Sequence, residues 1–460
     1  MADAQTHEPG CATRRIDFPL GALCLVGRPD EPEGEWLLQE GDDGSFLAIA
    51  GLPVDGSVAT AGRGVLPPGL GGAPGGDASA IRSLLRGLDG AFVALWWNAR
   101  DATLTVVTDF LGMQPLYRAD PDGATLIASE VKALARSGEL DVEPDAGAWG
   151  AMLYFGHQVG PRTLLAGVTR LPPARELVFD SSRRGVVREA STWEWPASAG
   201  RPDSPALRDA IGDAVRADVA AYAAAHPGAS LLLSGGFDSR LILCLCRDIG
   251  LSPRLLVQSH PDENADADAR FARAFARALG MPATTFPARA GFYGSADYLR
   301  FLALNEIATP SLYLFIPNVL PVVRGERDGV WEGLLLDPAL KFDYGSGGFA
   351  SYLESRIGGR RRSYARAVRR AFSPAWADRM DAEYDALLAA ERGEYPDDEE
   401  GVWRFSVLNR SRLRTGVNPY LVYDSHTPAL TPGMSRRFWE VVSSADPRLR
   451  FGKRLYRSVF

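Results

Sequence analysis

Residues Ser234–Ser239 combine types and spacing that could bind a phosphate group. They read Ser-Gly-Gly-Phe-Asp-Ser and follow the apolar run Leu231–Leu233. An apolar run, a glycine pair and then an amphipathic stretch predict a strand, a tight turn and the start of a helix. Glycine lets the backbone pass close to a ligand, and the first turn of a helix presents free N–H groups and the positive end of its dipole. This turn therefore suits an anion.

Asp238 would lie beside such a phosphate, where a carboxylate is repelled unless a metal ion bridges the two anions. Mg²⁺ is the usual bridge, because it combines one or two carboxylates with phosphate oxygens. A glycine turn capped by Ser234 would also explain the Ser-Gly-Gly part alone. The full pattern after an apolar strand favours a phosphate site made by Ser234, Gly235, Gly236, Asp238 and Ser239.

The composition is that of an ordinary globular protein. The chain has 460 residues, 46% of them hydrophobic and 23% charged, which predicts two or three domains, each with its own core. A net charge of −7 argues against general nucleic-acid binding. Four cysteines are too few for a disulfide framework, and no apolar run is long enough to span a membrane. We expect a cytoplasmic protein with neither nucleic acid nor membrane as a partner.

One segment, Arg356–Arg370, is strongly basic. The simpler interpretation is a solvated helix face. The alternative is a surface for an acidic peptide or carrier.

Residues 16–195 are predicted to form a layered sheet domain. Short apolar runs separated by Gly, Pro and Asp recur there, among them Phe46–Ala50 and Ala91–Trp97. Residues 62–77 are rich in Gly and Pro and predict a loop. The polar residues 1–15 are expected to be disordered.

Residues 196–205, rich in Pro and Ser, predict a linker to a second domain at 206–460. A helix is expected at Leu207–Ala224, a strand at Arg254–Gln258 and a periodic helix at Glu263–Leu279. Alternating strands and helices indicate an α/β fold with a parallel sheet. Ligands of such sheets bind at the carboxyl ends of the strands, where the glycine turn lies.

Three N-terminal motifs resemble the glutaminase domain of asparagine synthetases: Leu88–Trp96 (LDGAFVALW), Asp109–Tyr117 (DFLGMQPLY) and Ala128–Leu134 (ASEVKAL). Residues 161–173 resemble the passage from that domain to the synthetase domain. The resemblance covers nearly the whole chain. It implies an N-terminal layered α+β domain like the N-terminal-nucleophile glutaminases, and a C-terminal parallel-sheet synthetase domain like the adenine-nucleotide α-hydrolases.

The N-terminus departs from this family. Its glutaminases need a cysteine directly after Met1, whereas Ala2 stands here. Cys11 would require the removal of ten residues and is followed by alanine rather than glycine. We expect no glutaminase activity, and the domain resembles the retained scaffold of β-lactam synthetases and lasso-peptide cyclases.

The resemblance implies roles for several residues of the second domain. Ser234–Ser239 would bind pyrophosphate, and Leu233 and Val257 would line the adenine site. Gly333 and Asp337 match a glycine-rich stretch of the family, so Gly333 is expected at the nucleotide and Asp337 as a second Mg²⁺ ligand beside Asp238.

That stretch is altered, however. Leu335 replaces a glycine, Pro338 a glutamate, and Leu334 a residue that helps to deprotonate the amine. The general base therefore stays unassigned among Glu332, Asp343, Tyr344 and His426.

Residues 450–457 (RFGKRLYR) resemble the terminal Arg-x-Gly-Lys-x-x-x-Arg motif of the synthetases. The resemblance implies that Lys453 contacts the adenylate and stabilises negative charge as the amine attacks.

Together these features predict an ATP- and Mg²⁺-dependent ligase that adenylates a carboxylate and forms an amide, releasing AMP and pyrophosphate. A carboxylate-bearing small molecule or peptide would be the substrate, with ring closure or peptide macrocyclisation in natural-product or antibiotic biosynthesis as the expected setting. A precursor peptide or carrier is an expected partner. The alternatives are an amidotransferase fed by free ammonia or a partner glutaminase, and a degenerate synthetase acting as a scaffold.

Overall fold

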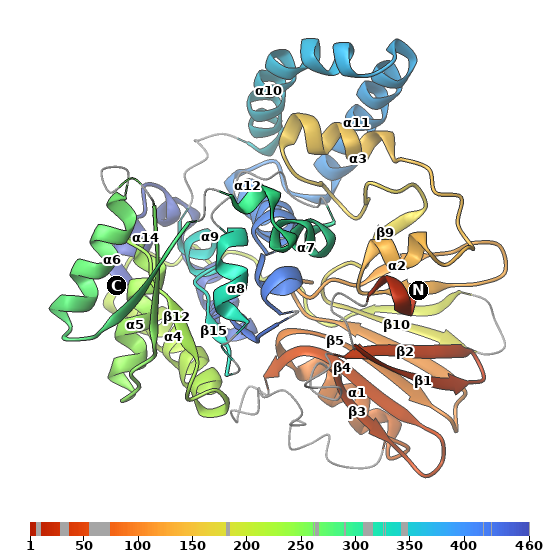
Figure 1. Ribbon diagram of the computed structural model, residues 1–460, viewed down its shortest axis with the longest axis horizontal. Helices are drawn as coiled ribbons and strands as arrows, with labels where there is room; N and C mark the ends of the chain where they lie inside the picture. Colours follow the sequence, from red (N-terminus) through yellow and green to blue (C-terminus); the bar gives the residue numbers. More distant parts are fainter. Residues whose placement is uncertain are drawn as a thin grey trace.

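The computed structural model describes every residue except 6–10, 28–35, 55–73, 181–184, 261, 263–265, 289–290, 307–315, 325, 327, 342–347, 417, 425 and 460. The chain forms two halves side by side, the N-terminal half coloured red to yellow and the C-terminal half mainly green to blue (Figure 1). The predicted α/β class is confirmed: the first half contains antiparallel sheets and the second a parallel sheet.

The N-terminal half is layered. A six-stranded sheet has the order β11-β10-β6-β5-β4-β3, and a β1-β2 pair and a three-stranded sheet β8-β7-β9 accompany it. Its strands are β1 (Ala12–Phe18), β2 (Gly21–Gly27), β3 (Trp36–Glu40), β4 (Phe46–Val54), β5 (Asp89–Asn98), β6 (Thr103–Thr108), β7 (Tyr117–Ala119), β8 (Leu126–Ala128), β9 (Val168–Arg170), β10 (Arg175–Asp180) and β11 (Val186–Ser191). Its helices are α1 (Ala78–Gly87), α2 (Val131–Ala135), α3 (Ala146–Gly150) and the short η1 (Ala2–Ala4) and η3 (Ala151–Phe155).

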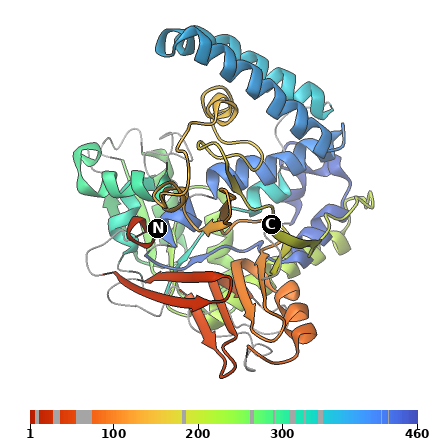
Figure 2. The same cartoon turned by 90° about the vertical axis from the view of Figure 1, so that its right-hand side faces the viewer.

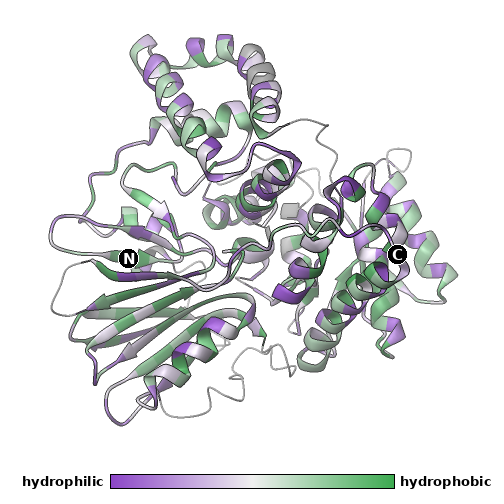
Figure 3. Cartoon of the chain, turned by 180° about the vertical axis from the view of Figure 1, so that it is seen from behind, coloured by the Kyte–Doolittle hydropathy of each residue, from purple (hydrophilic) through white to green (hydrophobic). Residues whose placement is uncertain are grey.

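Strand β5 lies at the centre of this half and is buried along its whole length. Because side chains alternate along a strand, Phe92 and Trp96 pack toward Leu85 of α1, whereas Val93 and Leu95 pack toward the opposite layer. Much of the sheet in this half is correspondingly apolar, coloured green in Figure 3. Both faces of the sheet are therefore covered.

The expected disorder of residues 1–15 is wrong at both ends of that range. Residues Ala2–Ala4 form a 3₁₀ turn, and β1 begins at Ala12. The polar β1 is held by antiparallel pairing with β2, and the Phe18 ring packs on Phe46 and Trp97. Of the predicted 62–77 loop, residues 62–73 lie outside the described residues.

The C-terminal half is built on a five-stranded sheet with the order β14-β13-β12-β15-β16. All neighbouring strands are parallel, as predicted. The strands are β12 (Ser230–Leu232), β13 (Leu255–Ser259), β14 (Ala283–Pro287), β15 (Val330–Trp331) and β16 (Ala429–Leu430).

Helices pack on both faces of this sheet. Leu231 and Val257 share a core with α4, α5 and α6, whereas Leu232 and Phe286 pack toward α7 and α8. The helices are α4 (Pro205–Ala225), α5 (Phe237–Asp248), α6 (Ala267–Ala278), α7 (Ala296–Asn305), α8 (Leu320–Val323), α9 (Leu336–Leu340), α10 (Phe349–Ala371), α11 (Pro374–Glu394), α12 (Glu399–Phe405), α13 (Arg436–Ser444) and α14 (Arg454–Val459). Further helical segments are the 3₁₀ turns η4 (Phe292–Gly294), η5 (Ile316–Val319) and η8 (Pro447–Arg450) and the π-helices η6 (Ser406–Thr415) and η7 (Asn418–Tyr423).

The predicted helix over 207–224 and strand over 254–258 are confirmed, with small shifts at their ends. Helix α4 begins at Pro205 because the Ser204 side chain caps it by accepting the N–H of Leu207. Helix α6 covers Ala267–Ala278 of the predicted 263–279, and residues 263–265 lie outside the described residues.

Helices α10 and α11 form a hairpin that projects from the body (Figures 1 and 2). Ion pairs hold described arginines of the basic run within this hairpin: Arg361 contacts Asp381 and Asp385, and Arg369 contacts Asp378 and Asp381. These contacts favour the structural interpretation of the basic segment.

A buried hydrogen-bond network around Asp109 and Arg412 joins the two halves at the Asp109–Tyr117 motif. The Asp109 carboxylate accepts the backbone N–H groups of Leu111, Met113 and Gln114, each at 3.0 Å. Arg412 of η6 donates from Nε to the Gly112 carbonyl (2.9 Å) and from Nη2 to the Leu171 carbonyl (2.7 Å). A side chain at Gly112, whose φ is +61°, would meet Arg412 Nε at 3.0 Å, which explains the glycine.

Replacing Arg412 by methionine is expected to lower the free energy of unfolding by about 3 kcal/mol, because the Leu171 carbonyl loses its side-chain donor and Asp109 loses a nearby buried charge. Denaturant unfolding measures the change. The exposed Arg366 of α10, replaced in the same way, is the control and should shift stability by less than about 0.5 kcal/mol. Equal stabilities of the two variants would contradict a structural role for the hydrogen-bond network around Asp109 and Arg412.

Candidate functional site

The predicted strand, glycine turn and helix are confirmed around Ser234–Ser239. Strand β12 ends at Leu232, and α5 begins at Phe237 with Gly236 as its N-cap. Ser239 Oγ accepts the backbone N–H of Ser234 at 3.0 Å, and Ser234 Oγ accepts that of Gly236 at 3.1 Å. The two hydroxyls lie 3.0 Å apart. Hydrogen bonds from the backbone of the turn to the two serine hydroxyls therefore stabilise its conformation.

Asp268 of α6, which sequence reasoning missed, contacts this turn. The Gly235 N–H donates to Asp268 Oδ1 at 3.0 Å, and a Cβ on Gly235 would lie 3.0 Å from the same oxygen. A protein carboxylate thus accepts a hydrogen bond from an N–H group that a bound phosphate oxygen would otherwise accept from. An acidic residue at the start of the next helix was the available signal.

The turn opens into a cavity of about 350 Å³. Of the predicted residues, Leu233, Ser234, Asp238, Ser239 and Gly333 line it. The other lining residues come from β12, β13 and β14, from the segment between β15 and α9, and from α6, η5, η6 and η7: Leu232, Leu256, Gln258, Asp268, Phe286, Val319, Glu332, Leu334, Thr415, Pro419 and Tyr423.

The side chain of Val257 does not line this cavity, contrary to the expectation for the adenine site. It is fully buried on the other face of β13, while Leu256 and Gln258 face the cavity. The cause is the alternation of side chains along a strand.

Gly333 is the residue that brings the two predicted loops together. A Cβ at Gly333 would lie 2.5 Å from the Asp238 Cβ, so only glycine permits this approach. Leu335, which replaces a family glycine, is fully buried beside Gly433 instead of facing the cavity.

The carboxylates around Asp238 influence one another. Burial, followed by the charge of Asp337, raises the pKa of Asp238 to about 7. The hydrogen bond donated by Tyr456 and the charges of Lys341 and Lys453 lower this pKa but do not offset the increase. Burial, followed by the charge of Asp238, raises the pKa of Glu332 to about 7. These groups lie within electrostatic reach of one another.

Asp337 lies in the first turn of α9, outside the cavity wall, with its side chain 45% exposed. Its Oδ1 is 3.4 Å from Lys341 Nζ. Among the described residues no group of three or more His, Cys, Asp or Glu side chains has the geometry of a preformed metal site. The carboxylates of Asp238 and Asp337 still match the hard oxygen ligands that Mg²⁺ takes when phosphate oxygens complete its shell.

Of the candidates for general base, Glu332 lines the cavity. His426 is buried outside the cavity wall, and Asp343 and Tyr344 lie outside the described residues.

Tyr456, also missed by sequence reasoning, ties the C-terminal helix α14 to the turn. Its hydroxyl donates to Asp238 Oδ1, and its ring contacts that of Phe237 edge-on. Burial and the negative charge of Asp238 raise the pKa of Tyr456, so the hydroxyl stays protonated and remains a donor.

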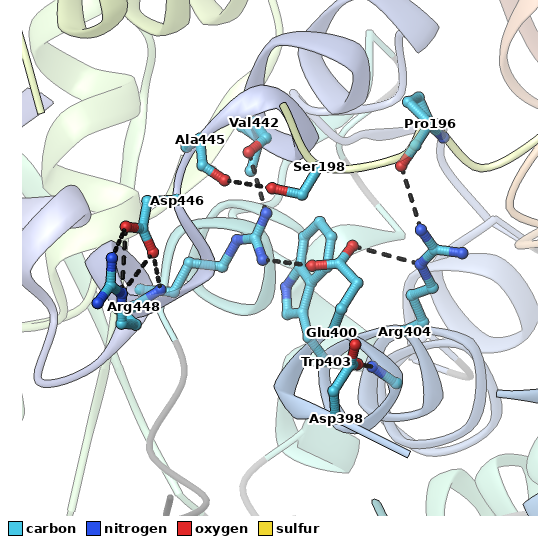
Figure 4. A network of polar contacts seen from close by, with 12 residues as sticks. Pro196, Ser198, Asp398, Glu400, Trp403, Arg404, Val442, Ala445, Asp446 and Arg448 are labelled. Carbon is cyan, nitrogen blue, oxygen red and sulfur yellow. Dashed lines mark hydrogen bonds and ion pairs between the residues drawn. The ribbon is translucent and has the colours of Figure 1, made fainter. Parts of the chain in front are cut away.

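Lys453 lies in a turn anchored by the network of Figure 4, in which Glu400 is the central acceptor. The buried Arg450 donates to Glu400 Oε2 at 2.9 Å, and its guanidinium lies 3.6 Å from the Trp403 ring centre. Gly452 and Lys453 then both adopt left-handed backbone conformations, with φ of 61° and 62°. A lysine held at positive φ is unusual and typical of functional positions.

A second cavity, of about 240 Å³, lies where the N-terminal half meets η7. Met1, Ala2 and Cys24 line it together with Gln114, Glu130 and Asp424, whereas Cys11 does not. Ala2, at the position where the glutaminases that this domain resembles carry their cysteine, therefore lines this cavity.

Purified protein is expected to release no glutamate from glutamine, with or without ATP, because Ala2 offers no thiol. A coupled glutamate assay checks this, and Cys11→Ala should behave like the wild type. Robust hydrolysis that is lost in Cys11→Ala would contradict the prediction, and hydrolysis lost in Cys24→Ala would place the nucleophile in the cavity wall.

Comparisons with known proteins bear on the N-terminal domain. Residues 80–189 match the family model described as a glutamine amidotransferase domain. The N-terminal half is therefore a glutamine amidotransferase-like domain, and the chain as a whole is an α/β protein in which that domain precedes a parallel sheet. In this segment the chain is similar to amidotransferase enzymes, as the resemblance to asparagine synthetases implies.

Two solved structures are similar to the chain. One is glutamine phosphoribosylpyrophosphate amidotransferase from B. subtilis complexed with ADP and GMP, at 14% identity over 72% of this chain and 70% of that one, with a TM-score of 0.26. The other, described as the allosteric regulatory enzyme of purine biosynthesis, has 13% identity over 61% and 59%, with the same TM-score. Similarity at this level adds nothing to the functional assignment. No curated protein matches the chain.

None of the helices in the described part of the chain is long and apolar enough to cross a bilayer.

Proposed function

We propose that the chain is an ATP-dependent ligase that adenylates a substrate carboxylate and joins it to an amine, releasing AMP and pyrophosphate. The observation that supports this most directly is the Ser234–Ser239 turn between β12 and α5, which opens with Asp238 and Gly333 into a cavity at the carboxyl end of the parallel sheet. Turns of this position in parallel sheets are where nucleotides bind.

In the first step, an oxygen of the substrate carboxylate attacks the α-phosphorus of ATP, and the bond to the pyrophosphate leaving group breaks. The N–H groups of the Ser234–Ser239 turn would hold that pyrophosphate, with the Gly235 N–H exchanging Asp268 for a phosphate oxygen. Mg²⁺, held by Asp238 and Asp337, would supply positive charge to the phosphate oxygens.

In the second step, the amine nitrogen attacks the acyl carbon, and AMP leaves with the bonding electrons. We propose Glu332, which lines the cavity, as the group that would accept the proton that the amine loses. Lys453 would stabilise the negative charge that develops. Orientation of the two reactants in one cavity accounts for much of the rate gain in reactions of this type.

Because Ala2 provides no route to ammonia from glutamine, we propose that the amine belongs to the substrate itself or to a second substrate. Ring closure of a peptide or small molecule fits this requirement, as in natural-product biosynthesis.

A second candidate is a scaffold without catalysis. The ion pair of Asp337 with Lys341 and the contact of Asp268 with Gly235 favour it, because both engage groups that ATP and Mg²⁺ would need.

Isothermal titration with ATP and Mg²⁺, followed by exchange of labelled pyrophosphate into ATP with candidate carboxylates, separates the two. Binding and carboxylate-dependent exchange support the ligase. Absence of ATP binding in every titration supports the scaffold.

A further inference from the structure

The amide of Gln258 is the feature of the cavity that the proposed chemistry leaves unexplained. Gln258 lies near the carboxyl end of β13, and its side chain lines the cavity. Its Nε2 atom is buried and has no hydrogen-bond acceptor among the described residues. Buried amide donors without an acceptor destabilise a protein and are rare in native structures. A ligand that supplies the missing acceptor would explain why the Gln258 amide is unpaired here.

The surroundings of that amide are apolar. Gln258 is registered with Phe286 of β14, and Leu256 with Leu232 of β12, so their side chains share one face of the sheet. Val319 and Tyr423 close the same part of the cavity. One polar amide therefore stands in a wall of aliphatic and aromatic side chains.

The position of Gln258 suits a ligand that also contacts the Ser234–Ser239 turn. The Ser234–Ser239 turn follows β12, and Gln258 lies on β13, its direct neighbour. Both border the same cavity, so a ligand with its phosphates at the turn can also reach Gln258.

From this placement we infer that Gln258 recognises the adenine edge of ATP and thereby selects the nucleotide. A glutamine amide presents a donor and an acceptor side by side, and adenine presents its exocyclic amine beside a ring nitrogen. Nε2 would donate to the ring nitrogen while Oε1 accepts from the amine. The inference rests on the proposed ATP-dependent function and adds the residue that reads the base.

The test compares ATP with purine riboside triphosphate, which lacks the exocyclic amine, by isothermal titration in the presence of Mg²⁺. Wild-type protein should bind ATP about 10-fold more tightly than the analogue. Gln258→Leu should bind ATP about 10-fold more weakly than the wild type and bind both nucleotides equally. Gln258→Glu keeps the size of the side chain and an acceptor for the exocyclic amine but loses the donor to the ring nitrogen, so it should bind both nucleotides more weakly than the wild type.

Stability separates recognition from a structural role. Gln258→Leu removes an unpaired buried donor, so the thermal midpoint of the ligand-free protein should stay the same or rise. A structural glutamine would lower the midpoint when replaced. Gln114→Leu, at a glutamine of the second cavity whose Oε1 is also buried without a partner among the described residues, is the matched control and should leave nucleotide discrimination unchanged.

Wild-type protein that binds ATP but does not discriminate, or a Gln258→Leu variant that still discriminates, would overturn the role of Gln258 while leaving the ligase proposal in place. Wild-type protein that binds neither nucleotide would overturn the ligase proposal, and the role of Gln258 with it.

Discussion

Replacing Lys453 by methionine is expected to slow product formation by about 100- to 1000-fold while leaving ATP binding nearly unchanged. Only interactions that are stronger in the transition state than in the ground state accelerate a step, and negative charge develops as the amine attacks the adenylate. Methionine keeps most of the length and the apolar stem of lysine but removes the ammonium. Single-turnover rates measured beside ATP titrations would show the two effects separately.

Two neighbouring arginines are the matched controls for Lys453. Arg454 and Arg457 belong to the same C-terminal segment but are exposed, whereas Lys453 is half-buried at its left-handed position. Their methionine variants should change the rate little. Equal small effects at all three positions would mean that Lys453 is ordinary surface charge.

The anchoring of the segment explains why Lys453 should differ from its neighbours. Arg450 is fixed by Glu400 and Trp403 before the turn, and Tyr456 is fixed by Asp238 after it. The turn that carries Lys453 is thus held at both ends. A backbone held in this way presents its side chain from a fixed position, which favours strong charge stabilisation.

Local patterns allowed the Ser234–Ser239 turn to be predicted from sequence, because a strand, a glycine pair and a helix start are each encoded by adjacent residues. The parallel sheet followed from the alternation of strands and helices. The contributions of Asp268 and Tyr456 could not be predicted in this way, since both come from helices that pack on the turn only in the folded chain.

Two errors have physical causes that a sequence hides. Val257 was expected to line the adenine site, but the alternation of β13 buries its side chain and turns Gln258 toward the cavity instead. The N-terminal residues were expected to be disordered because they are polar, but pairing with β2 satisfies the backbone of β1 regardless of its side chains. In both cases the partner strand decides the outcome.

Replacing Asp238 by asparagine is expected to reduce carboxylate- and Mg²⁺-dependent pyrophosphate exchange by about 100-fold or more, because a neutral amide is a poor ligand for Mg²⁺ beside phosphates. Asp337→Asn should also reduce exchange, since it removes the second proposed ligand. Tyr456→Phe is the control for position alone: it removes the hydrogen bond to Asp238 but leaves the carboxylate. Its exchange should fall by about 10-fold, the usual effect of losing a partner that orients a metal ligand.

The stability of Asp238→Asn distinguishes a lost ligand from a damaged fold. Asparagine keeps the shape of the side chain and an oxygen that can accept a hydrogen bond from Tyr456.

The pKa of Asp238 is raised from 3.8 to about 7 in the folded protein, so the charged carboxylate destabilises the native state above pH 7. That cost disappears as the pH falls through 7 toward 4, because the folded protein then binds the proton more readily than the unfolded chain. Without Mg²⁺, the asparagine variant should therefore be more stable than the wild type at pH 8, with a difference that shrinks toward pH 4. Thermal unfolding across this range would reveal it. A variant that is less stable at pH 8 would show that Asp238 holds the fold, and exchange at the wild-type rate would exclude it as the metal ligand.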